Sequence, residues 1–306
     1  MDPLEDVLDL LDVRGHVSAG FVAGGDWAVG FAPPSGVKFN TVRKGRCCLT
    51  VGESVRVPLA EGDCFLLTRP VSFVLGSAWD RTPVDAEPLF TAAGDTTVRV
   101  GSGDDTVLVG GGFSFGDRAR TLLLDFLPPL IHIPADTPQA DAVRWALTQI
   151  ARELNHRSPG SRLVVEHLAV VMLVHVLRLH LTRETAAGPG WPAGLADPVV
   201  APVLSAVHDR PAHPWTVAEL AAVARVSRSA LAARFKDVVG RPPLDYLTRW
   251  RIELASRDLR QGREPLATIA RRVGYGSESA LSTAFKRVTG VSPSDYRGAG
   301  RARRGS

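Results

Sequence analysis

The chain has 306 residues, 45% of them hydrophobic and 22% charged, a globular composition that excludes wholesale disorder. A chain of this length usually forms more than one hydrophobic core, so we expect two domains. Three cysteines (Cys47, Cys48 and Cys64) are too few for a disulfide framework, and we find no uninterrupted apolar run near the roughly 18 residues of a membrane span. The acidic start lacks the order of a secretory signal, and we expect a soluble, cytoplasmic protein.

The net charge of +4 is divided unevenly along the chain. Residues 1–210 hold 18 of the 36 Lys and Arg and 24 of the 32 Asp and Glu, a balance of −6. Residues 211–306 hold the other 18 Lys and Arg and only 8 Asp and Glu, a balance of +10. Such a basic segment favours binding to nucleic acid, although a merely soluble basic surface gives the same balance.

Up to about residue 130 the apolar runs are short and often alternate, with Gly, Pro and Asp between them. Examples are Arg46–Val51, Cys64–Leu67 and Phe73–Leu75. Strands of this length separated by turn residues predict a β-sandwich or barrel over residues 1–130.

From about residue 138 the apolar period becomes helical. Apolar residues recur at three- and four-residue steps from Val143 to Ile150 and again from Leu168 to Leu179. We therefore predict a helical element over 131–184. Its apolar surface is wider than a cover on a small barrel needs, which favours a homodimer interface, with a purely intramolecular role as the alternative. Residues 185–197 are rich in Gly, Ala and Pro without periodicity, and they are predicted to be a linker.

Residues 227–246 and 277–296 match each other at a constant offset of 50. Identical pairs include Ser227/Ser277, Leu231/Leu281, Phe235/Phe285, Lys236/Lys286, Gly240/Gly290, Pro243/Pro293 and Tyr246/Tyr296. Upstream the match continues with a slip of one residue, because Leu220 precedes Ser227 by seven positions and Ile269 precedes Ser277 by eight. This pattern indicates an internal duplication of one structural unit.

Local rules build each copy as two helices joined by a turn. In the first copy, Thr216 and Glu219 form a capping box that starts one helix. Ser227 then N-caps a second helix, which Gly240 ends. Helix, short turn and exposed helix make a helix-turn-helix, whose second helix enters the DNA major groove. We predict such motifs near 216–239 and 266–289, and a helical repeat that only packs against itself is the alternative.

Between the copies, Pro243 to Arg260 places apolar residues at helical spacing. A helix of about 16 residues would span roughly 24 Å. This suits two recognition helices held near one DNA turn, about 34 Å, apart. One chain should therefore bind two major-groove segments.

The stretch from Trp215 to Arg297 resembles the DNA-binding domain of the AraC/XylS family of transcription regulators. The resemblance rests on WTVAELAAVARVSRSALAARF, GRPPLDYLTRWRIELA and LATIARRVGYGSESALSTAFKRVTGVSP, followed by SDYR. It implies a DNA-binding domain over 198–299. It also implies base-facing positions, which are Ser229, Ala232 and Ala233 in the first recognition helix and Glu278, Ser279, Ser282 and Thr283 in the second.

Arginine is common in the family at the positions of Ala233 and Thr283, and both are missing here. Because a bidentate arginine–guanine contact is worth roughly 1–3 kcal/mol of discrimination, we expect weaker direct readout and more reliance on phosphates. The residues expected to contact phosphates are Ser227, Arg228, Lys236, Arg249, Ser277, Lys286 and Arg287. Arg234 is as compatible with a structural role as with a DNA contact.

Phe39–Gly45 and Leu59–Leu67 resemble the cupin-type sensor domain found ahead of such DNA-binding modules. That resemblance implies a small-molecule pocket, with plain core as the alternative for each aromatic residue. The expected lining residues are Trp27, Phe39, Arg69 and Phe73. Relatives that bind metal often carry histidine at the positions of Asn40 and Phe73, so we expect no metal, no cofactor and no enzymatic activity. A redox role for Cys47 or Cys48 would need a lowered thiol pKa.

These patterns predict a multidomain α and β protein. The expected architecture is an N-terminal cupin-like β-barrel with a helical hairpin and a C-terminal all-α double helix-turn-helix. We expect a transcription regulator that binds double-stranded DNA as a homodimer and responds to an unknown small-molecule effector. The alternatives are a cupin-fold enzyme and a ligand-independent DNA-binding scaffold.

Overall fold

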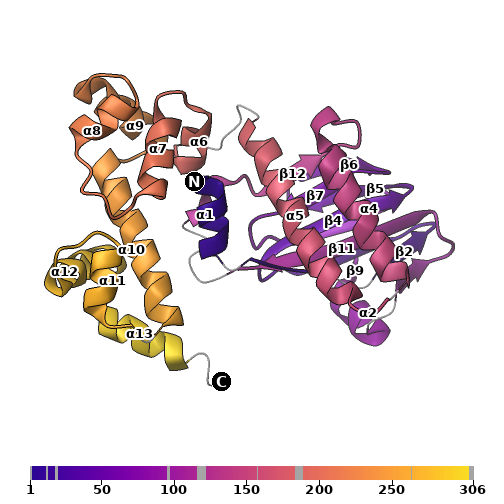
Figure 1. Cartoon of the computed structure of the whole chain (residues 1–306). Helices are drawn as coiled ribbons and strands as arrows, with labels where there is room; N and C mark the ends of the chain where they lie inside the picture. Colours follow the sequence, from indigo (N-terminus) through magenta and orange to yellow (C-terminus); the bar gives the residue numbers. More distant parts are fainter. Residues whose placement is uncertain are drawn as a thin grey trace. The chain divides into compact units, whose positions relative to one another are not determined.

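The computed structural model describes residues 2–11, 13–17, 20–94, 97–115, 122–156, 158–182, 189–262 and 264–302. The chain divides into two compact units (Figure 1). We call Leu11–Ala187 the β-unit, and Met1–Leu10 together with Gly188–Ser306 the helical unit.

Two sheets form the β-unit. The first runs β10-β2-β11-β4-β7-β12 with β1 also paired to β11, and the second runs β6-β5-β8-β3-β9. The strands are β1 (Arg14–Val17), β2 (Phe21–Gly24), β3 (Ala28–Phe31), β4 (Val37–Lys44), β5 (Arg46–Val51), β6 (Val55–Ala60), β7 (Cys64–Leu67), β8 (Phe73–Gly76), β9 (Val84–Asp85), β10 (Val98–Gly101), β11 (Thr106–Ser114) and β12 (Leu130–Ile133). Most neighbouring strands are antiparallel, an arrangement in which one face of a sheet packs on the core and side chains alternate between the two faces.

Alternation along the strands creates the core of the β-unit. In β5, Cys47, Leu49 and Val51 are buried while the residues between them are more exposed. They join one apolar cluster that includes Trp27 and Phe73. The predicted β-rich N-terminal fold is therefore confirmed as two sheets around an apolar cluster.

The helices of the β-unit are α2 (Ala86–Ala93), α4 (Asp141–His156) and α5 (Ser161–Thr182), with short 3₁₀ turns at Leu124–Phe126 and Pro138–Ala140. Helix α5 packs closely on β1, since a Cβ on Gly15 would lie 3.0 Å from the carbonyl oxygen of Glu166. Ser161–His180 is long and apolar enough to cross a membrane, the single such helix among the described residues. Charged residues, among them Glu166 and Arg178, interrupt this helix, and Ala169, Met172 and Val176 are buried, as in a helix that covers a sheet.

The helical unit contains α1 (Pro3–Leu10), α6 (Trp191–Ala196), α7 (Val200–Asp209), α8 (Val217–Val223), α9 (Arg228–Val239), α10 (Pro243–Gln261), α11 (Leu266–Arg272), α12 (Glu278–Thr289) and α13 (Pro293–Ala302). Helix α10 joins the pair α8 and α9 to the pair α11 and α12 (Figure 1). Leu259, Ile269 and Phe285 belong to one apolar cluster that fixes the second pair on α10.

Two expected boundaries differ from the structure. Residues 191–196 form helix α6 instead of a loop, because Trp191 is buried and a Cβ on Gly194 would touch Leu204 and Val200. The earlier part of the predicted linker, residues 185–188, lies outside the described residues. The first ten residues belong to the helical unit rather than the barrel, and Leu4 and Val7 of α1 are buried there.

Candidate nucleic-acid interface

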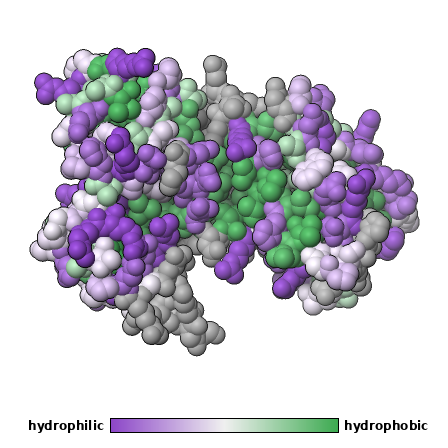
Figure 2. Space-filling view, in the orientation of Figure 1, coloured by the Kyte–Doolittle hydropathy of each residue, from purple (hydrophilic) through white to green (hydrophobic). Residues whose placement is uncertain are grey.

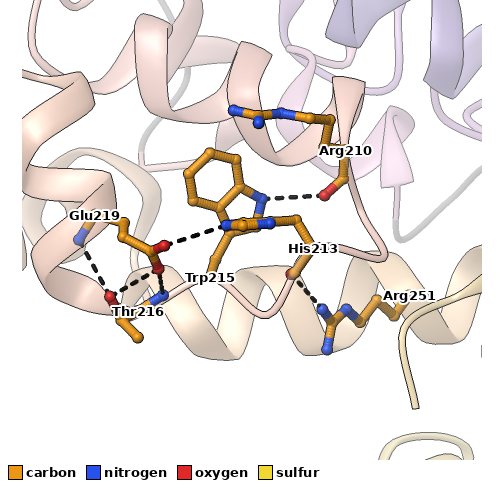
Figure 3. A network of polar contacts seen from close by, with 6 residues as sticks. All are labelled: Arg210, His213, Trp215, Thr216, Glu219 and Arg251. Atoms are coloured by element: carbon orange, nitrogen blue, oxygen red, sulfur yellow. Dashed lines mark hydrogen bonds and ion pairs between the residues drawn. The ribbon is translucent and has the colours of Figure 1, made fainter. Parts of the chain in front are cut away.

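The first helix-turn-helix follows a loop between α7 and α8 that several hydrogen bonds hold in place (Figure 3). Thr216 and Glu219 form the predicted capping box, and His213 Nε2 lies 3.3 Å from a carboxylate oxygen of Glu219. Trp215 Nε1 donates to the carbonyl oxygen of Arg210 at 3.0 Å. Arg251 on α10 donates to the carbonyl oxygen of His213 at 2.7 Å. Hydrogen bonds at the helix start and to the loop backbone thus fix where α8 begins.

The two turns share one hydrogen-bond pattern. Val226 donates its amide to the Ala221 carbonyl at 3.0 Å, and Tyr275 donates to Ala270 at 2.8 Å. The residue before each donor is left-handed, with φ 56° at Arg225 and 84° at Gly274. After these donors the second motif has an extra residue, Gly276, which accounts for the one-residue slip in the sequence match.

Each recognition helix buries one face and exposes the other. Leu231 and Phe235 in α9, and Leu281 and Phe285 in α12, are fully buried. The N-caps Ser227 and Ser277 accept the amides of Ala230 and Ala280, both at 3.1 Å. The predicted base-facing positions Ser229, Ala232, Ala233, Glu278, Ser279 and Thr283 are exposed, and Ser282 is half-buried. The arrangement presents two matched surfaces of the kind that enters a major groove.

The basic residues of the helical unit fall into two groups. Within its described part, the following side chains make no ion pair or hydrogen bond: Arg225, Arg228, Lys236, Arg271, Lys286 and Arg287. All belong to the helix-turn-helix motifs. Arg249, which we expected to contact a phosphate, instead binds Asp245 at 3.0 Å. Its charge is partly neutralised within the protein, so it is less suited to that contact than the first group.

Arg234 has a structural partner. Its guanidinium binds the buried carboxylate of Asp197 at 2.6 Å, and Asp197 also accepts the amides of Val199 and Val200 at 2.9 Å. Burial alone would raise the pKa of Asp197, but these hydrogen bonds and the arginine lower it. Arg234 therefore ties α9 to the start of α7, which favours the structural reading of this residue.

The four residues expected to line a pocket do not share one site. Trp27, Phe39 and Phe73 are nearly fully buried, and Phe73 stacks on Phe31 at 4.5 Å, so they form core. Arg69 binds the carbonyl oxygen of Leu124. A different groove of about 260 Å³ lies between β12 and α5, where sequence reasoning did not look for a site. Its wall includes Ile131, His132, Val176, Leu179 and His180.

Other chemistry in the β-unit is limited. Among the described residues, no group of three His, Cys, Asp or Glu side chains is arranged to hold a metal. Burial raises the pKa of both Cys47 and Cys64 to about 12, the opposite of what a reactive thiol needs. His132 is held by Asp63 at 3.1 Å, and Asp63 also accepts the amides of Ala60 and Ala135.

A double helix-turn-helix unit accompanied by a cupin unit defines a class of DNA-binding regulators. Residues 2–182 match a cupin family and residues 220–299 match a helix-turn-helix family. The chain belongs to the AraC-like transcription regulators. It is 63% identical to a putative AraC-like transcription regulator of Streptomyces lividans over 97% of this chain and 98% of the relative. A similar relative from Streptomyces antibioticus is 62% identical over the same shares.

One solved structure provides a further likeness. The DNA-binding domain of AdpA, crystallised in complex with a target DNA, is 35% identical and covers 36% of this chain and 99% of that chain, with a TM-score of 0.34. The helix-turn-helix match and the two Streptomyces relatives, not this likeness, show that the chain is a DNA-binding AraC-like regulator, and they confirm the resemblance of Trp215–Arg297 to that family.

Proposed function

We propose that the chain regulates transcription in the cytoplasm by placing α9 and α12 in two major-groove segments of one asymmetric DNA site. The observation that carries this proposal is the pair of matched, exposed helix faces bordered by basic side chains that have no partner among the residues that the structure describes. Unpaired Lys and Arg bind phosphates without first breaking an ion pair. In this proposal Ser229, Ala232, Ala233, Glu278, Ser279, Ser282 and Thr283 face base edges.

A shift assay with promoter fragments tests the proposal. The full chain should retain a shifted fragment in excess competitor DNA, and affinity should fall steeply between 50 and 200 mM salt, as expected for about six or more phosphate contacts. Lys236→Ala and Lys286→Ala should each weaken binding, while Lys44→Ala in the β-unit serves as the control because Lys44 already binds Asp104. Equal affinity for all duplexes would contradict sequence-specific regulation.

The proposal includes a small-molecule effector, and its proposed site is the groove between β12 and α5, because Trp27 and Phe73 are packed in the apolar cluster of the β-unit. Two imidazoles, those of His132 and His180, stand on an otherwise apolar wall. A metabolite that binds there should raise the thermal midpoint of the parent protein. The same compound should have no effect on Leu179→Trp, whose indole fills the groove. An equal rise of the thermal midpoint in both proteins would contradict this groove as the effector site.

We also propose a homodimer formed through α4 and α5. Figure 2 shows apolar side chains gathered over α5, and large exposed apolar residues include Trp145 at 55%, Leu163 at 60% and Val171 at 40%. Analytical ultracentrifugation should show a dimer that Leu163→Glu combined with Val171→Glu dissociates. Val84→Glu, a control at an exposed valine of β9, should leave it intact. A parent that is monomeric at micromolar concentration contradicts this interface.

A further inference from the structure

The two recognition helices carry opposite charges at their first residue. Arg228 opens α9 and Glu278 opens α12, each directly after the serine N-cap, at the same offset of 50 that relates the two motifs. Both side chains are exposed, and neither makes an ion pair or a side-chain hydrogen bond with any residue that the structure describes. The duplication therefore provides an internal comparison in which the fold is constant and the leading side chain differs.

Glu278 is also chemically distinct on the surface proposed to meet the bases. The other proposed positions hold only serine, threonine and alanine, so Glu278 is the one long, charged side chain among them. The N-terminal residues of a recognition helix are those that contact base edges. An ionised carboxylate only accepts hydrogen bonds, so its partner must be a donor on the floor of the major groove.

Two bases present such a donor in the major groove. Cytosine offers its N4 amine, whereas adenine places its N6 amine beside the N7 acceptor, which would face the second carboxylate oxygen. We propose that Glu278 reads a cytosine in the half-site bound by α12. This inference rests on the proposed function, because it assumes that α12 lies in the groove.

The same carboxylate acts against the wrong DNA. DNA phosphates repel the Glu278 carboxylate, and only a hydrogen bond from a cytosine amine offsets this repulsion. Glu278 therefore lowers the affinity for duplexes that lack this cytosine. A structural explanation of Glu278 is that an acid in the first turn stabilises the helix dipole. That role affects stability, whereas reading a base also changes sequence preference, and the two are separable by experiment.

Binding-site selection from a randomised duplex library, with the full chain, tests the inference. The parent should enrich cytosine at one position by about tenfold over other bases, the lower part of the range for one good base contact. Glu278→Gln, which keeps the shape and gains an amide donor, should shift that position toward adenine and bind competitor DNA more tightly. Asp237→Asn is the control, because it removes one negative charge from an exposed face of α9 away from the proposed base-facing positions.

The outcomes separate this inference from the proposed function. Enrichment of a common site with no cytosine at any position, or an identical site preference for the parent and Glu278→Gln, overturns the role of Glu278 and leaves sequence-specific binding intact. A parent that enriches no site overturns the proposed function itself. If Asp237→Asn gains as much affinity for competitor DNA as Glu278→Gln does, net charge alone causes the effect. That outcome would also overturn the inference.

Discussion

Arg251 and Tyr275 join the two helix-turn-helix motifs. The guanidinium carbon of Arg251 lies 5.7 Å from the centre of the Tyr275 ring, at the turn of the second motif. The same guanidinium donates to the carbonyl oxygens of Pro211 and His213, both at 2.7 Å, in the loop that leads to the first. Burial lowers the pKa of Arg251, although it stays protonated at any physiological pH. A single side chain on α10 thus links the loop before the first motif to an aromatic ring in the turn of the second.

This junction predicts that Gly274 accepts no side chain. Its φ is 84°, and an added Cβ would lie 2.6 Å from the Ala212 carbonyl oxygen and 2.8 Å from Arg251 Nη2. We expect Gly274→Ala to lower the free energy of unfolding by at least about 1 kcal/mol, measured by urea denaturation. Gly276→Ala is the control, since nothing lies within 4 Å of its added Cβ. Equal stability of the two variants would contradict the close packing of this turn.

The corresponding residue of the first motif predicts the opposite change. Arg225 is exposed and adopts φ 56° without the freedom of glycine. Arg225→Gly should therefore raise the free energy of unfolding by roughly 1 kcal/mol, because it relieves left-handed strain. Arg225→Ala keeps a Cβ in the same conformation and should give no such gain. If alanine stabilises as much as glycine, the effect arises from charge and not from the backbone.

The contrast between these turns shows what the sequence could and could not reveal. The duplication, the capping box and the N-caps are local, so residues 216–239 and 266–289 were enough to predict two helix pairs. Trp191 and Val7 are buried in the helical unit through contacts with residues far along the chain. Composition alone placed Trp191 in a linker and Val7 in the barrel. The partners of Arg234 and Arg249 are likewise tertiary, so a list of basic residues could not separate structural ones from those free to bind DNA.

That separation predicts different effects for two neighbouring residues of α9. Arg234→Ala leaves the buried Asp197 carboxylate without its cation and should cost about 1–3 kcal/mol of stability. Lys236→Ala should leave the unfolding midpoint unchanged, weaken binding to all duplexes alike and reduce the salt slope by about 1. Urea denaturation and shift assays at several salt concentrations measure the two effects. A normal salt slope in Lys236→Ala would remove this residue from the phosphate contacts.

The buried His208 predicts how stability changes with pH. Its Nδ1 lies 3.1 Å from Asp6 of α1, its Nε2 lies 2.8 Å from the Tyr246 hydroxyl, and its ring stacks on Trp250 at 4.1 Å. Burial lowers the pKa of His208 below its usual 6.5, and Asp6 offsets this only in part. The native state therefore favours the neutral imidazole. Its stabilising effect is fully present above pH 6.5 and is lost as the pH falls below that value.

Thermal unfolding of the full chain from pH 8 to pH 5 measures this dependence. The midpoint should fall on acidification in the parent protein, and it should fall less in His208→Gln, which cannot take up a proton. Asp6→Asn removes the group that raises the pKa of His208, so its midpoint should fall more steeply than that of the parent. His167→Gln, at an exposed histidine of α5, is the control and should follow the parent curve. A parent curve that matches the His208→Gln curve would show that His208 takes up protons equally in the folded and the unfolded chain, which contradicts its lowered pKa in the folded state.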